Sequence, residues 1–302
     1  MLAEEAKSPS MYLKPEVIRQ IERLDLKAKY IIEGFISGLH GSPYHGFSVE
    51  FSEHRKYEPG DEINTIDWSV YGRTDRYYVK KFRAETNMQC YLVVDSSPSM
   101  NYSTGGITKF DYSVGIAAAL AYLMIRQNDP VGMVTFSNRV RGFLPPRSRR
   151  SHLNVILEHL AKLRPTGQTR VGDSLHEIAE LIRRRSMIIV FSDFLEELDS
   201  IVPALHHLAF KRHDIILFHV LDHAEVTLPF DDLATFTDVE TGEKLVADPA
   251  AVRTHYLQAL DRHLEALRMR AGEARIDYLL MDTATPYDKA LSTFLLNRKA
   301  RS

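Results

Sequence analysis

The sequence predicts an α/β fold, a doubly wound and mostly parallel sheet, preceded by a smaller module of helix and short strands. From about Cys90 onward, short apolar runs alternate with segments whose apolar residues recur at helical spacing. The runs are continuously apolar, as in parallel strands that helices cover on both faces. Before Cys90 no such alternation occurs. We therefore expect an N-terminal module at 1–89 and an α/β domain at 90–302.

The order of elements in the main domain follows from these two patterns. The apolar run at 91–94 predicts the first strand, and helical spacing predicts a helix over 110–127. A strand at 131–136 is followed after a short turn by a strand at 140–144, a hairpin spacing that predicts an antiparallel edge. The later elements are expected as helices at 150–163, 171–184, 198–210 and 287–297 and as strands at 187–191, 215–221 and 275–281.

An insertion at about 228–272 interrupts the alternation before the last strand. Two short strand-like segments flank Glu240-Thr241-Gly242-Glu243, a pattern typical of a small hairpin. The next segment opens on an Asp-Pro pair, an N-cap followed by a first-turn proline. It predicts a helix from Asp248 to about Ala271.

The N-terminal module has a different character. We expect a helix over 15–36, followed by a region rich in Gly, His, Tyr and charge with short β-like pieces. Trp68 is the only tryptophan, and its indole is expected to bury against the main domain. A structural role between the modules is the favoured interpretation, and a partner-binding surface is the alternative.

Composition is that of an ordinary soluble globular protein. Of 302 residues, 44% are hydrophobic and 26% charged, and the formal net charge of −2 gives no global attraction to nucleic acid or an anionic membrane. Cys90 is the only cysteine, which excludes an internal disulfide and a thiolate zinc cluster and suits a reducing cytosol. No apolar run reaches the roughly 18–20 residues that span a bilayer, and no secretion signal is recognisable. We expect a cytoplasmic protein.

Polar side chains gather where the expected strands end. Asp95, Ser97 and Ser99 follow the first strand, Asp193 follows a later one, and Thr169 lies in the loop before a helix. Because the carboxyl ends of adjacent parallel strands meet at one edge, these residues could surround a single ion. Carboxylates and hydroxyls are hard oxygen donors that suit Mg²⁺ or Mn²⁺ rather than zinc. Chance is the competing explanation, since Asp and Ser are common turn and cap residues.

These residues carry a resemblance to two known groups of proteins. Asp95-Ser96-Ser97-Pro98-Ser99, Thr169 and Ser192-Asp193 resemble the metal-ion-dependent adhesion site (MIDAS) of a von Willebrand factor A (vWA) domain. Upstream, Arg55-Lys56-Tyr57-Glu58-Pro59-Gly60-Asp61, Ile66-Asp67-Trp68 and Arg73 resemble the signature of the DUF58 family. The resemblance implies a vWA-like fold and a divalent ion (Mg²⁺, or Mn²⁺ or Ca²⁺) held by Asp95, Ser97, Ser99, Thr169 and Asp193. It also implies partnership with a MoxR-like AAA+ ATPase or its client.

Catalytic and nucleic-acid functions have less support. A haloacid-dehalogenase-like phosphatase needs a second Asp two residues after the strand-end Asp, where this chain has Ser97. The segment Ser103–Lys109 lacks Walker A spacing, and no dinucleotide, zinc-protease or nucleophile-elbow motif occurs. The arginine runs at 147–150 and 183–185 are typical of solvated helix ends.

We therefore expect a non-enzymatic, metal-dependent protein–protein interaction module with no catalytic residues. A partner's Asp or Glu is expected to complete the shell of the ion, and the pair is expected to act in assembly or maturation of other proteins. The alternative is a metal-dependent, phosphoesterase-like hydrolase that uses the same strand-end ion. Neither nucleic acid nor a membrane span is expected.

Overall fold

The computed structural model describes residues 54–56, 72, 76–80, 88–104, 106–287 and 289–290 of the chain. These residues fall into two compact units, one within Pro43–Asn87 and one within Met88–Ser302. In the first unit, β1 (His54–Lys56) pairs antiparallel with β2 (Tyr78–Lys80). The predicted helix at 15–36, Trp68 and most of the upstream motif lie outside the described residues. The boundary at residue 89 stays a prediction.

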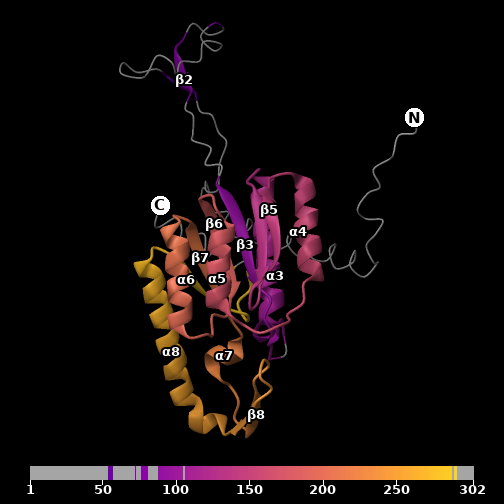
Figure 1. The fold of residues 1–302 in the computed structure, drawn as a ribbon, viewed down its shortest axis with the longest axis vertical. Helices are drawn as coiled ribbons and strands as arrows, with labels where there is room; N and C mark the ends of the chain where they lie inside the picture. Colours follow the sequence, from indigo (N-terminus) through magenta and orange to yellow (C-terminus); the bar gives the residue numbers. More distant parts are fainter. Residues whose placement is uncertain are drawn as a thin grey trace, which may run out of the picture. The chain divides into compact units, whose positions relative to one another are not determined.

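The larger unit is built on a six-stranded sheet (Figure 1). Its order is β10-β7-β6-β3-β4-β5, in which only β5 runs antiparallel to its neighbour. The predicted α/β fold class and the antiparallel edge strand are therefore confirmed. The strands are β3 (Gln89–Asp95), β4 (Val131–Phe136), β5 (Val140–Arg147), β6 (Ser186–Ser192), β7 (Asp214–Leu221) and β10 (Asp277–Asp282).

Helices cover the sheet on both faces, which explains the continuously apolar strands. On one face, α5 (Val171–Leu181), α6 (Leu198–Phe210) and α8 (Pro249–Glu273) share an apolar cluster with alternate residues of the strands, among them Val93 and Val190. On the other, α3 (Lys109–Arg126) packs against β3, β4 and β7, and α4 (Arg150–Lys162) lies beside α3. The central strands are fully buried as a result.

Capping side chains mark the start of two predicted helices, α3 and α8, close to their predicted positions. Thr108 accepts a hydrogen bond from the Asp111 amide at the start of α3, and Asp248 accepts one from the Ala250 amide at the start of α8. The helix predicted over 171–184 is shorter than expected and ends at Leu181, because the next residue, Ile182, turns to an extended conformation. The predicted closing helix at 287–297 lies mostly outside the described residues.

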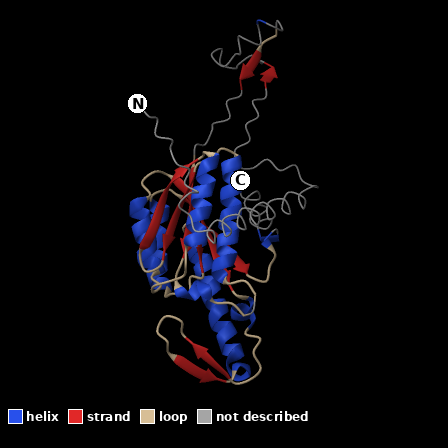
Figure 2. Cartoon of the chain, turned by 90° about the vertical axis from the view of Figure 1, so that its right-hand side faces the viewer, coloured by secondary structure: helices blue, strands red, loops and turns tan. Residues whose placement is uncertain are grey.

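A hairpin and a long helix lie between β7 and β10, preceded by one short helix that the sequence analysis missed. A short helix, α7 (His223–Thr227), follows β7 directly, and the predicted hairpin forms from β8 (Ala234–Thr237) and β9 (Lys244–Ala247). The hairpin lies beyond the carboxyl end of the sheet, on the side where β3 and β6 end (Figures 1 and 2). It is therefore placed over the predicted site.

Among the described residues, we find no helix that is both long and apolar enough to cross a membrane.

Candidate metal and ligand site at the carboxyl end of the sheet

Asp95 is the innermost residue of the candidate site. It is the last residue of β3 and is completely buried. Its Oδ1 accepts a hydrogen bond from the Ser97 amide at 2.9 Å, and its Oδ2 accepts one from the Ser192 hydroxyl at 2.6 Å. Because Ser192 ends the adjacent parallel strand β6, this bond ties together the two strand ends that the sequence analysis expected to meet.

The two serines after Asp95 lie side by side. Ser97 is the N-cap of a short 3-10 helix, η3 (Pro98–Asn101), which follows the strand end. Pro98 favours this helix because its ring fixes φ near the helical value. The hydroxyl oxygens of Ser97 and Ser99 are 3.1 Å apart, and the Ser97 side chain is completely buried. Two hydroxyl oxygens thus lie close to the Asp95 carboxylate.

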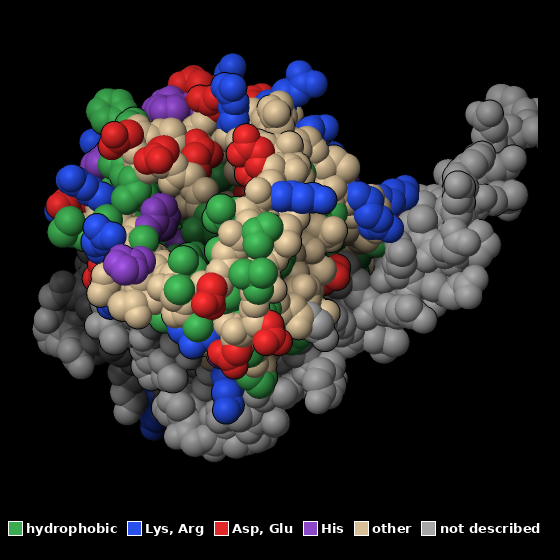
Figure 3. Space-filling view, turned by 90° about the horizontal axis from the view of Figure 1, so that it is seen from below, with side chains coloured by type: hydrophobic (Ala, Val, Ile, Leu, Met, Phe, Trp, Pro, Cys, Tyr) green, Lys and Arg blue, Asp and Glu red, His purple; other side chains and the backbone are tan. Residues whose placement is uncertain are grey.

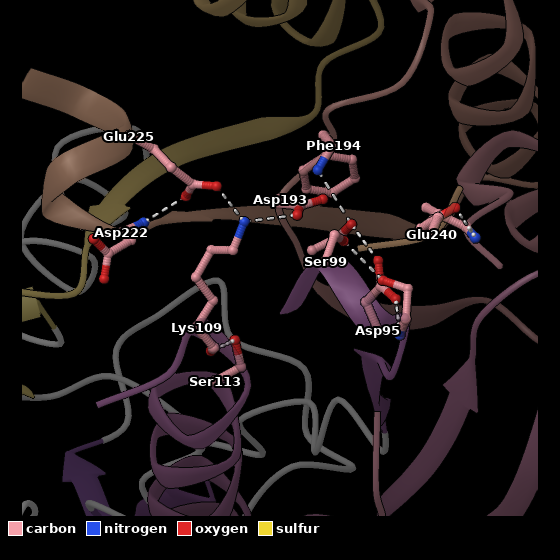
Figure 4. A network of polar contacts seen from close by, with 12 residues as sticks. Asp95, Ser99, Lys109, Ser113, Asp193, Phe194, Asp222, Glu225 and Glu240 are labelled. Carbon is pink, nitrogen blue, oxygen red and sulfur yellow. Dashed lines mark hydrogen bonds and ion pairs between the residues drawn. The ribbon is translucent and has the colours of Figure 1, made fainter. Parts of the chain in front are cut away.

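The second carboxylate of the site, Asp193, is paired with a buried lysine (Figure 4). Asp193 directly follows β6, and its Oδ2 accepts a hydrogen bond from Lys109 Nζ at 2.9 Å. Lys109 also donates to Glu225 Oε1 at 2.7 Å and lies between the two carboxylates. The side chains of Lys109 and Asp193 are each 1% exposed, so water contributes almost nothing to this pair.

The charges of the site are unevenly compensated. Burial raises the pKa of Asp95, and the negative charge of Asp193 raises it further, to about 7, against the hydrogen bonds of Ser192 and Ser97. Burial acts in the same direction on Asp193, but the Lys109 charge and hydrogen bonds from Lys109 and Ser99 outweigh it and hold that pKa below its ordinary value. Lys109 therefore compensates Asp193, while Asp95 has no cation of its own among the described residues.

Thr169 lies in the loop before α5, and the same loop contacts the chain just after β3. The Thr166 amide in the same loop donates to the Ser96 carbonyl at 2.8 Å, which holds the loop against the strand end. The Thr169 amide donates to Glu240 Oε2 at 3.0 Å, and its hydroxyl donates to Glu240 Oε1. Both oxygens of an acidic side chain from the hairpin turn are thus bound by Thr169.

Asp222 also follows a strand, but its side chain belongs to the N-terminal cap of α7. It caps α7 by accepting a hydrogen bond from the Ala224 amide at 2.9 Å, and it accepts another from the Thr104 hydroxyl. Glu225 Oε2 accepts from the Asp222 amide at 2.8 Å and completes a capping box. Since Glu225 also binds Lys109, the capping box joins α7 to the candidate site.

The structure brings four of the five predicted site residues into one hydrogen-bonded group and places Thr169 in the adjoining loop. The sequence analysis missed three residues that shape the site, Lys109, Glu225 and Glu240. Lys109 could have been suspected, because a cation in the first turn of a helix opposes the macrodipole and is stabilised by an acidic partner. Asp222-x-x-Glu225 matches a capping box. For Glu240 the sequence has no signal beyond its position in a turn.

The sequence profile of a protein family described as "Protein of unknown function DUF58" matches residues 53–266. "Uncharacterized protein Mb1516" of Mycobacterium bovis is 28% identical over 274 residues, which cover 86% of each chain.

Solved structures with a similar arrangement include a conserved hypothetical protein BatB from Bacteroides thetaiotaomicron and the VWA domain of SpRpn10. BatB has 17% identity and a TM-score of 0.45, and the match covers 71% of this chain and 100% of that one. The SpRpn10 domain has 14% identity and a TM-score of 0.41, and the match covers 68% and 93%.

Proposed function

This chain belongs to the DUF58 family, and we propose that it is a non-enzymatic protein-interaction module that depends on a divalent cation. The residues proposed to hold the cation are Asp95, Ser97, Ser99, Thr169 and Asp193. The observation that carries the proposal is a pair of buried carboxylates, Asp95 and Asp193, for which the described residues supply one lysine. A buried carboxylate without a compensating charge is costly, and the raised pKa of Asp95 reflects that cost.

The donor set fits a small, hard cation. With Asp95, Asp193 and Glu225 ionised, Lys109 compensates one of three negative charges, and the excess matches a divalent ion. Each carboxylate oxygen has two lone pairs, so Asp95 can bind an ion while keeping its hydrogen bonds to Ser97 and Ser192. Hydroxyl and carboxylate oxygens, with water completing the shell, are the usual ligands of Mg²⁺ and Mn²⁺, and Ca²⁺ takes the same donors.

Each side chain of such a site has its own role. Asp95 and the serine hydroxyls would bind the cation. Lys109 keeps Asp193 ionised, because the lysine charge opposes the effect of burial on the pKa of that carboxyl. When bound, the cation would offer an open coordination position to an acidic side chain of a partner protein. Thr169 has an amide and a hydroxyl that already donate to a carboxylate, so this edge of the site is suited to an acidic ligand.

A MoxR-like AAA+ ATPase, or its client, is the partner we propose. This choice rests on the resemblance of the sequence to the DUF58 signature and to a MIDAS, and on the family to which the chain belongs. The cytoplasmic location is likewise a proposal, and it rests on the single cysteine, which cannot form an internal disulfide.

Binding of Mn²⁺ and capture of the ATPase test this function together. Asp95→Asn keeps the shape of the side chain but removes its charge, so it should lose Mn²⁺ binding by calorimetry and lose capture of a MoxR-like ATPase from the same genome. A chelator should abolish capture by the wild type. Asp261→Asn, at an exposed position of α8, is the matched control and should behave as wild type.

Two results would contradict the proposal. One is an Asp95→Asn variant that keeps wild-type Mn²⁺ affinity and capture. The other is Mg²⁺- or Mn²⁺-dependent turnover of a phosphoester panel that Asp95→Asn abolishes, which would support the hydrolase alternative instead.

A further inference from the structure

The chain's own hairpin delivers an acidic side chain to the candidate site. Glu240 lies in the turn between β8 and β9, and both of its carboxylate oxygens are bound by Thr169, one by the amide and one by the hydroxyl. Thr169 is one of the five proposed cation ligands. A carboxylate of this chain therefore occupies the edge of the site that the proposed function assigns to the acid of a partner (Figure 4).

The hairpin turn is built so that Glu240 is presented inward. Asp238 Oδ1 accepts hydrogen bonds from the Glu240 amide at 2.7 Å and the Thr241 amide at 3.2 Å, and the Asp238 amide donates to the Glu243 carbonyl. Gly242 has a φ of +73°, a conformation that favours glycine and closes the turn. In this turn Glu240 is half-buried, while its neighbours are exposed.

The rest of the hairpin is lightly held. Within the described residues β8 and β9 pair only with each other, and an isolated two-stranded hairpin has marginal stability. Leu245 and Val246 in β9 are 66% and 60% exposed, so β9 contributes little apolar contact, and the ring of Phe236 in β8 packs edge to face against that of Phe230. Figure 3 shows this end of the molecule, where acidic and hydrophobic side chains lie next to one another on the surface. The contact of Glu240 with Thr169 is thus a main attachment of the hairpin tip.

We propose that Glu240 is an internal acidic ligand of the site and competes with the acid of a partner for it. This inference rests on the proposed function. While Glu240 is bound, a partner must displace the hairpin tip before its own carboxylate reaches the site. Because the tether keeps Glu240 at a high effective concentration, the hairpin lowers the apparent affinity for an external carboxylate. Removing Glu240 should raise that affinity by roughly tenfold or more.

The test compares Glu240→Ala with Glu243→Ala. Glu243 lies in the same turn and is exposed, so its replacement is a matched control. In metal-free protein, Glu240→Ala should accelerate amide hydrogen exchange in residues 234–247, and Glu243→Ala should not. With Mn²⁺ present, acetate serves as the external carboxylate. Its binding is followed by the change in the water-proton relaxation rate that the bound Mn²⁺ produces. Acetate should bind the Glu240→Ala variant at least about tenfold more tightly than the wild type or Glu243→Ala.

The outcomes separate the two proposals. If Mn²⁺ binds through Asp95 but Glu240→Ala binds acetate no better than Glu243→Ala, the internal ligand is wrong and the proposed function stands. If no variant binds Mn²⁺, the proposed function is wrong, and the proposed competition between Glu240 and the acid of a partner is wrong as well. If hydrogen exchange in the hairpin is the same in both variants, Glu240 does not hold the tip, which also overturns the inference.

Discussion

The Lys109 ammonium donates to the Asp193 carboxylate at 2.9 Å, and both side chains are 99% removed from solvent. The lysine comes from the first residue of α3 and the aspartate from the residue after β6, so the bond joins a helix start to a strand end. Glu225 of α7 accepts from the same ammonium. One buried cation therefore links the sheet, the first crossover helix and the start of the insertion.

Replacing Lys109 should destabilise the fold strongly. Lys109→Met fills a similar volume but leaves the buried Asp193 and the partly buried Glu225 without their cation, and removal of one partner of a buried pair costs about 3–5 kcal/mol. Chemical denaturation with measurement of the free energy of unfolding checks this. Lys162→Met, which breaks an exposed pair with Glu158, is the control and should cost less than about 1 kcal/mol. Equal losses of unfolding free energy in the two variants would show that the buried pair stabilises the fold no more than the exposed pair does.

The packing of α5 against α6 depends on a glycine. A Cβ at Gly172 would lie 2.5 Å from the Ser200 carbonyl oxygen, which belongs to the backbone of α6 and cannot move alone. Gly172→Ala should therefore reduce the free energy of unfolding by about 1–3 kcal/mol. Gly272→Ala is the control, since no atom lies within 4 Å of its Cβ position in α8. That change should stabilise the helix by about 0.5–1 kcal/mol, because alanine favours helix over glycine. Thermal unfolding of the two variants should shift in opposite directions.

Protonation of buried neutral histidines such as His213 should reduce stability in mildly acidic solution, whereas Asp95, whose pKa is raised, acts in the opposite direction over the same pH range. Burial lowers the pKa of His213, and its Nδ1 accepts a hydrogen bond from the Ser186 amide, which requires the neutral ring. At this position the unfolded chain binds more protons than the folded one below the ordinary histidine pKa of about 6.5, so the contribution of His213 to stability falls with the pH. One such group contributes a slope of at most about 1.4 kcal/mol per pH unit.

Two substitutions check the sign of this effect. His213→Asn keeps an acceptor for Ser186 but cannot titrate, so the loss of unfolding free energy between pH 7 and pH 5 should become smaller than in the wild type. The hydrogen bond and charge of Asp282 raise the pKa of the exposed His223, which therefore stabilises the protein at low pH. His223→Asn should make the loss larger. A His213→Asn variant with the wild-type slope would be inconsistent with a depressed pKa in the folded state.

Much of the fold could be predicted from local patterns. The continuous apolar runs at β3, β4 and β6 predicted buried parallel strands, and the short turn after β4 predicted the antiparallel edge strand β5. Some boundaries shifted by a few residues, as after Leu181, where the backbone turns to an extended conformation. The helix α7 was missed because five residues are too few for a helical pattern, although its capping box is readable in the sequence.

The candidate site, like the fold, could be predicted from the sequence only in part. By itself, the sequence determined which side chains follow the strands, and the meeting of parallel strand ends was enough to expect Asp95 near Asp193. Only the tertiary structure decided that Lys109 compensates Asp193 and that Glu240 binds Thr169. The physical reason is that these contacts join residues 84 and 71 positions apart in the chain. A local pattern reports the state of a segment, whereas such pairings depend on how helix, sheet and hairpin pack.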